Sequence, residues 1–285
     1  EYSSSLITDA LKDPEIHSDT MTFAEFTEAI RNEYTTPPGR AGFASRLGPL
    51  NAVWFHTRLF AILFSASSKV KDNVLDRHEA AVHGRRVLQL AETAGCRCHI
   101  SGFRHLEAVD GPAVIVANHI SAFETMVLPG MILPFKPFSF VLKSSLMKYP
   151  VLGKVLNGID PIVVERANAR EDLRTVLTEG HACLEAGKSV LLFPQHTRSL
   201  EIDLAGFNSL GVKLARGTGA PIVPIALRTD FLAKGRLIKD IGPIDPSLDL
   251  YFECGPAFEV EGSGKEAHRA SVDFIVERLK QWCSQ

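Results

Sequence analysis

The chain has 285 residues, of which 45% are hydrophobic and 22% are charged, and its formal net charge is −2 at pH 7. These values are typical of a globular protein and lack the strongly basic balance of nucleic-acid-binding proteins, so we expect no nucleic-acid partner. Five scattered cysteines without a C-x-x-C pair indicate a reduced, cytosolic setting rather than a disulfide framework or a zinc site.

The first 95 residues are predicted to form a polar arm and then a helical segment. Residues 1–46 are rich in polar and turn-forming residues, and we expect a loosely attached arm with one short helical pattern around 23–34. The helical segment, residues 47–95, contains predicted helices over 48–70 and 72–94. Apolar side chains nearly encircle the second half of the first helix, which is typical of an interfacial helix on a bilayer or of a buried core helix. No apolar stretch reaches the roughly 18 residues of a membrane-spanning helix.

From residue 96 to residue 285, short β-rich runs alternate with helical patterns. The predicted strands are residues 98–103, 113–118, 138–142, 160–164, 189–193, 222–228 and 249–254. The predicted helices are residues 122–133, 145–156, 169–186, 207–217 and 265–282. This alternation predicts an α/β domain with a mostly parallel central sheet flanked by helices.

A histidine and a glutamate follow the second of these strands. The apolar run ends at Asn118-His119, and Glu124 lies five positions after His119. On one continuous helix such positions point about 140° apart, so the two can meet only if His119 precedes a helix and Glu124 lies in its first turn. A carboxylate placed there would hold the imidazole in one tautomer, as a general base requires. Ser121 and Glu124 also have the spacing of a capping box, which explains the glutamate equally well.

Polar and charged residues recur where other predicted strands end. They are Lys143, Glu165-Arg166 and the run Pro194-Gln195-His196-Thr197-Arg198-Ser199. In an open α/β sheet, ligands bind outside the carboxyl ends of the strands. If the strands are parallel, His119 is gathered there with the cations Lys143, Arg166 and Arg198. A potential base beside several cations indicates a substrate that has a phosphate and a hydroxyl to be deprotonated.

Four ordered segments resemble the motifs of the glycerolipid acyltransferases, the family that includes bacterial 1-acylglycerol-3-phosphate acyltransferases. They are Asn118-His119-x4-Glu124, residues 158–166, residues 193–199 and residues 220–227. The resemblance covers about residues 96–260 and implies that His119 is the general base, oriented by Glu124. It further implies a substrate-binding set of Asn118, Ser121, Lys143, Arg166, Gln195, His196, Thr197 and Arg198, with the arginines at the acceptor phosphate. It implies no metal and no cofactor.

The implied reaction moves a fatty acyl group from acyl-CoA or acyl-carrier protein to the hydroxyl of lysophosphatidic acid or a similar lysophospholipid. We expect the protein to act peripherally, on the cytoplasmic face of a membrane. Glu124 replaces the commoner Asp, and Gln195-His196 replace the usual Glu-Gly of the third motif. An H-x4-E pair also occurs among lipid A and related acyltransferases, so an acceptor of that class stays open. A further alternative is a non-catalytic lipid- or acyl-carrier-binding protein of the same fold.

Overall fold

The computed structural model describes residues 21–39, 42–48, 50–195, 197–204, 206–235 and 241–284. In these ranges, eight strands form one sheet in the order β1-β2-β8-β7-β3-β6-β4-β5. The strands are β1 (Glu33–Thr35), β2 (Cys98–Ser101), β3 (Val114–Ala117), β4 (Phe138–Lys143), β5 (Ile162–Val164), β6 (Ser189–Leu192), β7 (Ile222–Arg228) and β8 (Leu250–Cys254). The β1–β2 and β7–β8 pairs are antiparallel and the other neighbours are parallel. The predicted α/β fold with a mostly parallel sheet is therefore confirmed.

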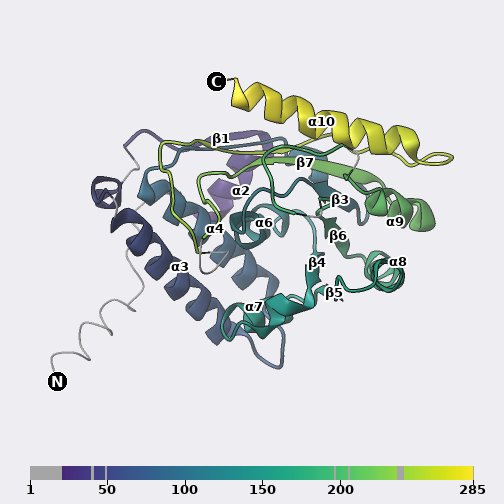
Figure 1. Cartoon of the computed structure of the whole chain (residues 1–285), viewed down its shortest axis with the longest axis horizontal. Helices are drawn as coiled ribbons and strands as arrows, with labels where there is room; N and C mark the ends of the chain where they lie inside the picture. Colours follow the sequence, from purple (N-terminus) through teal and green to yellow (C-terminus); the bar gives the residue numbers. More distant parts are fainter. Residues whose placement is uncertain are drawn as a thin grey trace.

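Helices cover both faces of this sheet (Figure 1). The helices are α2 (Phe23–Asn32), α3 (Leu50–Lys69), α4 (Arg77–Ala94), α5 (Arg104–Glu107), α6 (Phe123–Ile132), α7 (Leu152–Gly158), α8 (Ala169–Glu185), α9 (Leu210–Thr218) and α10 (Lys265–Cys283), with 3₁₀ turns η1 (Phe43–Arg46) and η2 (Ser144–Lys148). Helices α8, α9 and α10 pack on one face, whereas α4 and α6 lie against the other with α3 outside α4.

Strand β3 shows why the central strands are continuous apolar runs. Val114 and Val116 belong to the apolar core shared with α8, α9 and α10, and Ile115 and Ala117 belong to the core shared with α4 and α6. Successive side chains of a strand point to opposite faces, so a strand covered on both faces must be apolar throughout.

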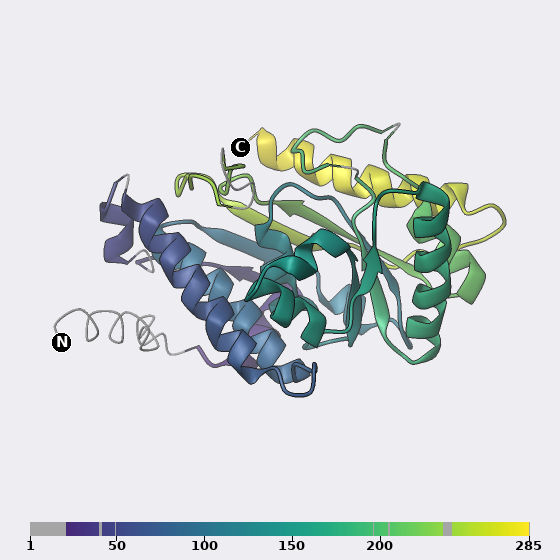
Figure 2. The same cartoon turned by 60° about the horizontal axis from the view of Figure 1, so that its bottom comes forward.

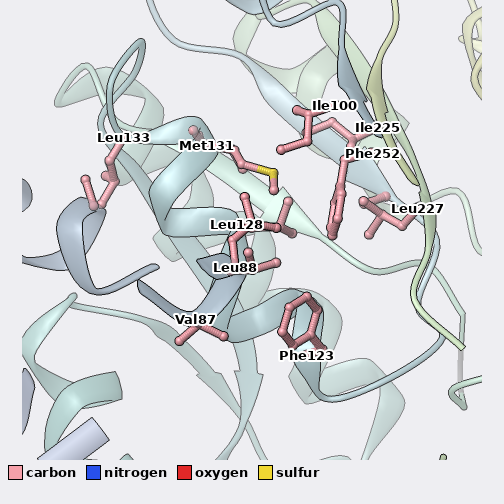
Figure 3. Packing of buried hydrophobic residues seen from close by; sticks show 14 of the residues in the cluster. Val87, Leu88, Ile100, Phe123, Leu128, Met131, Leu133, Ile225, Leu227 and Phe252 are labelled. Atoms are coloured by element: carbon pink, nitrogen blue, oxygen red, sulfur yellow. The ribbon is translucent and has the colours of Figure 1, made fainter. Parts of the chain in front are cut away.

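The core on the α4–α6 side joins helices to strands that are distant in sequence. Leu88 of α4 and Leu128 of α6 lie together, with Ile225 and Phe252 of the sheet beside them (Figure 3). These helices also approach closely at two glycines. A Cβ atom on Gly84 would lie 2.4 Å from the backbone nitrogen of Gly130, so both positions need the absence of a side chain. The position of α6, which carries Glu124, is thus fixed by α4.

The expected loose arm is wrong for the part of residues 1–46 that follows residue 21. A capping box formed by Thr22 and Glu25 starts α2, which buries Phe26 and Ile30 in the main core. Strand β1 then pairs with β2 at the edge of the sheet. Residues 1–20 lie outside the described residues. Helix α4 likewise shares the core of the α/β domain, so the helices of the 47–95 segment pack as part of the same body.

Two helix predictions need correction at their boundaries. The helix predicted over 145–156 is η2 followed by α7, because Pro150 disfavours a helical conformation of the residue before it. The helix predicted from residue 72 begins at Arg77, where the Asp76 carboxylate accepts backbone hydrogen bonds as its N-cap. The remaining predicted strands and helices of the α/β domain are present with boundaries that differ by a few residues.

Helix α3 is buried on one side and exposes apolar side chains on the other. Phe55, Leu59 and Ile62 are buried in the core, whereas Phe60 and Phe64 on the opposite side are 54% and 52% exposed. The helix runs along the outside of the molecule, with α4 and α7 against it (Figure 2). In the part of the chain that is described, none of the helices is both long and apolar enough to cross a bilayer.

Candidate active site

The carboxyl ends of five neighbouring parallel strands lie along one side of the sheet, in the order β7, β3, β6, β4 and β5; this side is the sheet edge at which the candidate site lies. The loops that begin there carry the residues that the sequence predicts at strand ends. His119 follows β3, and residues 193–199 follow β6. Lys143 is the last residue of β4, and Arg166 follows β5. Neighbouring strands lie about 4.8 Å apart, so β5 is about 14 Å from β3 along this edge. The predicted gathering of these residues at one edge is present.

His119 and Glu124 are in contact, in the arrangement that their five-residue spacing requires. His119 lies in the loop after β3, and Glu124 is the second residue of α6. The His119 Nδ1 atom is 2.8 Å from Glu124 Oε2, and Phe193 stacks on the imidazole with ring centroids 4.5 Å apart. An ionised carboxylate can only accept, so Nδ1 donates to Glu124, and in the neutral form of the imidazole the lone pair is on Nε2. The His119 side chain is 17% exposed and Glu124 is fully buried.

The second oxygen of Glu124 receives three further hydrogen bonds. Its donors are the backbone nitrogens of Ile120, at 2.8 Å, and Ser121, at 2.9 Å, and the Thr229 hydroxyl. Both oxygens therefore act only as acceptors, which is the behaviour of an ionised carboxylate. One oxygen caps the start of α6 while the other orients His119. The capping interpretation and the orienting interpretation are thus both satisfied, by different atoms of the same group.

Asn118 and Ser121, which the sequence predicts to bind substrate, are both buried in the fold. Asn118 is fully buried, and its side-chain amide exchanges two hydrogen bonds of 2.8 Å with the backbone of Leu227 on β7. The Ser121 hydroxyl is also buried and donates to Thr229 at 3.0 Å. These hydrogen bonds to protein partners position the loop that carries His119.

Gln195, also predicted to bind substrate, forms hydrogen bonds that link the loop after β3 to the loop after β6. Its Oε1 accepts a 2.6 Å hydrogen bond from the His119 backbone nitrogen, and its Nε2 donates to the Ser199 carbonyl at 3.2 Å. The Ser199 backbone nitrogen in turn donates to the His119 carbonyl at 2.9 Å. A glutamate here would keep the acceptor but lose the donor, so the amide suits this clamp. His196, the other departure in this motif, lies outside the described residues.

Two of the basic residues, Lys143 and Arg166, lie on the β5 side of His119, whereas the Arg198 carbonyl accepts a 2.8 Å hydrogen bond from Lys234, which follows β7. Arg198 follows β6 and is half-buried, whereas Lys143 and Arg166 are exposed. Lys143 is paired with Val164 in the β4–β5 register, so it lies close in the sheet to the strand end that carries Arg166. Arg166 has φ of +56°, a left-handed conformation that costs a non-glycine residue on the order of 1 kcal/mol and often marks a functional position. Thr197 is exposed beside Arg198.

Thr229 belongs to the site and is absent from the sequence prediction. It follows β7 directly, so the rule that finds polar residues at strand ends would have found it had it been applied to that strand. Phe193 was placed in the third motif without a role, and the structure shows that it supports the imidazole ring.

An apolar cavity lies between α3, α4, α6 and α7. Leu63, Val87, Met126 and Leu152 are representative of its walls. Two of its lining residues, Thr125 and Met126, directly follow Glu124 on α6. Within the described ranges, no three His, Cys, Asp or Glu side chains converge as metal ligands would.

Comparison with known proteins places this site in a family. The family model described as Acyltransferase matches residues 82–228. A 1-acyl-sn-glycerol-3-phosphate acyltransferase of Pseudomonas aeruginosa is 31% identical over 193 residues, which are 67% of this chain and 69% of that protein. A protein of the same name from Chlamydomonas reinhardtii is 34% identical over 45% of this chain, which spans only 37% of that longer protein.

A solved structure supports the fold independently. The crystal structure of the 1-acyl-sn-glycerophosphate (LPA) acyltransferase PlsC from Thermotoga maritima matches with a TM-score of 0.61, covering 85% of this chain and 98% of that one. At 16% sequence identity this likeness establishes a shared fold. Together with the family match and the Pseudomonas relative, it leads to one conclusion. The chain belongs to the acyltransferase family and is an O-acyltransferase.

Proposed function

We propose that the protein transfers a fatty acyl group from an acyl thioester of CoA or acyl-carrier protein to the free hydroxyl of lysophosphatidic acid or a similar lysophospholipid. The observation that carries this proposal is the contact between His119 and buried Glu124, at a sheet edge that also bears Lys143, Arg166 and Arg198. The names of the curated relatives support lysophosphatidic acid as the acceptor.

The reaction needs one base and no covalent enzyme intermediate. His119 Nε2 removes the proton of the acceptor hydroxyl as that oxygen attacks the thioester carbonyl carbon, forming the new C–O bond. Glu124 stabilises the imidazolium ion that results. The tetrahedral oxyanion then collapses, the C–S bond breaks, and the imidazolium returns its proton to the departing thiolate. The products are the diacyl lipid and a free thiol, and the histidine is restored.

The acceptor phosphate is proposed to lie on the β5 side of His119. Arginine guanidinium groups bind phosphate through paired hydrogen bonds, and lysine contributes a point charge. Arg198 comes from the strand next to β3, and Lys143 and Arg166 come from the two strands beyond it. A glycerol phosphate together with long basic side chains can span the distance of about 14 Å between the ends of β3 and β5.

The acyl chain is proposed to occupy the apolar cavity between α3, α4, α6 and α7. The observation that supports this placement is that Thr125 and Met126, which line the cavity, directly follow Glu124 on α6. Burial of each methylene group contributes about 0.8 kcal/mol, which favours a long fatty acyl group over a short one. The cavity lining also includes one titratable side chain, that of His83 on α4.

Peripheral association with the cytoplasmic face of a membrane is proposed to occur through α3. Its outer side exposes Leu50, Val53, Phe60 and Phe64, which recur at helical spacing along one stripe. Such a stripe would lie among the acyl chains of one leaflet. Flotation with liposomes should recover the wild-type protein and lose the Phe60→Asp/Phe64→Asp double variant. Leu204→Asp, which charges an exposed leucine outside α3, should float like wild type. Equal recovery of all three proteins would argue against this role for α3.

The proposed reaction is tested by mass spectrometry of lipid products together with thiol release. The purified protein is incubated with acyl-CoA or acyl-carrier protein and with lysophosphatidic acid, other lysophospholipids and a lipid A precursor. We expect a diacyl product from lysophosphatidic acid, and no product from a folded His119→Ala variant. Product from the lipid A precursor alone would replace the proposed acceptor. Lipid binding without thiol release for any acceptor would instead support the non-catalytic alternative.

A further inference from the structure

We propose that Thr229, supported by Ser121, is a positioning residue that holds the Glu124 carboxylate in the orientation that His119 needs. This inference rests on the proposed function, in which His119 is the base. Thr229 is fully buried at the carboxyl end of β7, and its hydroxyl donates to Glu124 Oε1. It lies outside the family-like segments and outside the matched residues 82–228.

The hydrogen bonds around Thr229 form a chain with only one possible direction. Glu124 can only accept, so the Thr229 hydroxyl must donate to it and has its lone pairs left for Ser121, whose hydroxyl lies 3.0 Å away. The Ser121 oxygen accepts from the backbone nitrogen of Phe123 at 3.2 Å, and that nitrogen can only donate. Because both ends are fixed, neither hydroxyl has an alternative orientation. Each hydrogen bond therefore polarises the next toward the carboxylate.

These hydrogen bonds also connect the Glu124 carboxylate to β7, the strand that already holds the loop carrying His119. Asn118, directly before His119, is bonded on both sides to Leu227, two residues before Thr229. The end of β7 thus fixes the backbone beside His119 and, through Thr229, the carboxylate that faces its ring. A rotation of the Glu124 carboxylate that weakened its contact with His119 would also break the Thr229 hydrogen bond.

Removal of the Thr229 hydroxyl should change the chemistry and not only the packing. Glu124 Oε1 would keep its two backbone donors, but the carboxylate would lose one donor that stabilises its charge. A less stabilised carboxylate attracts the proton of an imidazolium more strongly, so the free enzyme should stay protonated on His119 to a higher pH. The loss of one hydrogen bond of ordinary strength should move the acid limb of the pH profile by about 0.3–1 pH unit.

The protein offers a matched control for this deletion. Thr36 donates at 2.7 Å to Oε1 of Glu92, another buried carboxylate, and lies next to β1 at the far edge of the sheet. Thr36→Val removes the same kind of hydrogen bond as Thr229→Val but away from His119. A purely structural contribution of Thr229 should therefore give the same phenotype in both variants.

The experiment compares pH profiles of kcat/KM for lysophosphatidic acid and acyl-CoA. For Thr229→Val we expect kcat to fall about 3–10-fold, KM to change less than twofold, and the acid limb to move to higher pH. Thr229→Ser should restore both quantities, and Thr36→Val should keep the wild-type profile despite lower stability. A folded Thr229→Val with wild-type kcat and pH profile would overturn the inference, as would a Thr229→Ser variant that is equally impaired.

Two further comparisons keep the outcomes separable. If Thr229→Val does not fold, Ser121→Ala removes the preceding donor and should move the acid limb in the same direction by a smaller amount; an unchanged limb would refute the positioning role. Failure of the proposed function has a different signature, since wild type would then show no turnover or His119→Ala would remain active. Turnover by wild type, none by His119→Ala and no effect at Thr229 would reject only the inference.

Discussion

Glu124→Gln should prevent His119 from acting as a base, although the side chain at position 124 keeps its size. The Oε1 position faces three donors, two of them backbone nitrogens, so the amide oxygen must take that position. The opposite orientation would leave two buried N–H groups facing an NH₂ group, at a cost of about 2–6 kcal/mol. The NH₂ group therefore faces His119 Nδ1, which must become an acceptor, and the ring proton moves to Nε2. A base protonated on its reactive nitrogen cannot accept the hydroxyl proton.

We expect kcat to fall by about 10⁴-fold, the loss that accompanies the same tautomer error in a serine protease. The assay is thiol release at saturating substrates, together with ¹⁵N NMR of the imidazole, which reports the tautomer directly. Glu92→Gln is the control, because Glu92 is also buried and accepts from the Tyr34 and Thr36 hydroxyls. It should lower stability and leave kcat unchanged. A folded Glu124→Gln variant with kcat within tenfold of wild type would refute the tautomer argument.

Two predictions concern stability. Gly84→Ala should lower the unfolding free energy, measured by urea titration, by about 1–3 kcal/mol, because the new Cβ atom meets the Gly130 backbone. The control is Gly217→Ala, whose Cβ atom meets only the rotatable imidazole of His181, so this variant should be neutral or slightly stabilised. Equal effects of the two substitutions would contradict this reasoning. Burial lowers the pKa of His83 in the folded protein. Below about pH 6.5 the unfolded chain therefore binds a proton at His83 that the folded protein does not bind. As the pH decreases from there to the lowered pKa, the unfolding free energy decreases by up to about 1.4 kcal/mol per pH unit. His83→Gln should remove that part of the slope, and parallel wild-type and variant curves would show that His83 does not contribute.

The contact between His119 and Glu124 could be predicted because the helical period leaves a five-residue spacing only one solution. The sheet edge could be predicted because both faces of the central strands are covered, which makes their apolar runs continuous and their polar ends distinct. The structural hydrogen bonds of Asn118 and Gln195 could not be predicted from the sequence. Their partners are backbone groups of Leu227 and Ser199, and backbone groups leave no trace in side-chain patterns.

In the N-terminal region the helical pattern around 23–34 is confirmed by α2, but the attachment of this region to the domain was not predicted, because it depends on residues elsewhere in the chain. Strand β1 has three residues, too few for a visible alternation, and exists because the edge of β2 supplies hydrogen bonds. Helix α2 has its own capping box, but what holds it to the protein is the burial of Phe26 and Ile30 in a core built largely by later residues. Local sequence can specify such an element without revealing where it docks.

The glycine contact between α4 and α6 has a consequence for how this protein can diversify. Gly84 and Pro129 also border the apolar cavity, so that side of the cavity is made of helices that cannot move apart without displacing Glu124. The walls from α3 and α7 carry no such constraint, since residues such as Leu63 and Leu152 can change in size while α6 stays in place. If the acyl chain lies in this cavity as proposed, substitutions on α3 and α7 should change the preferred acyl-chain length while α4 and α6 keep the histidine–glutamate pair in place.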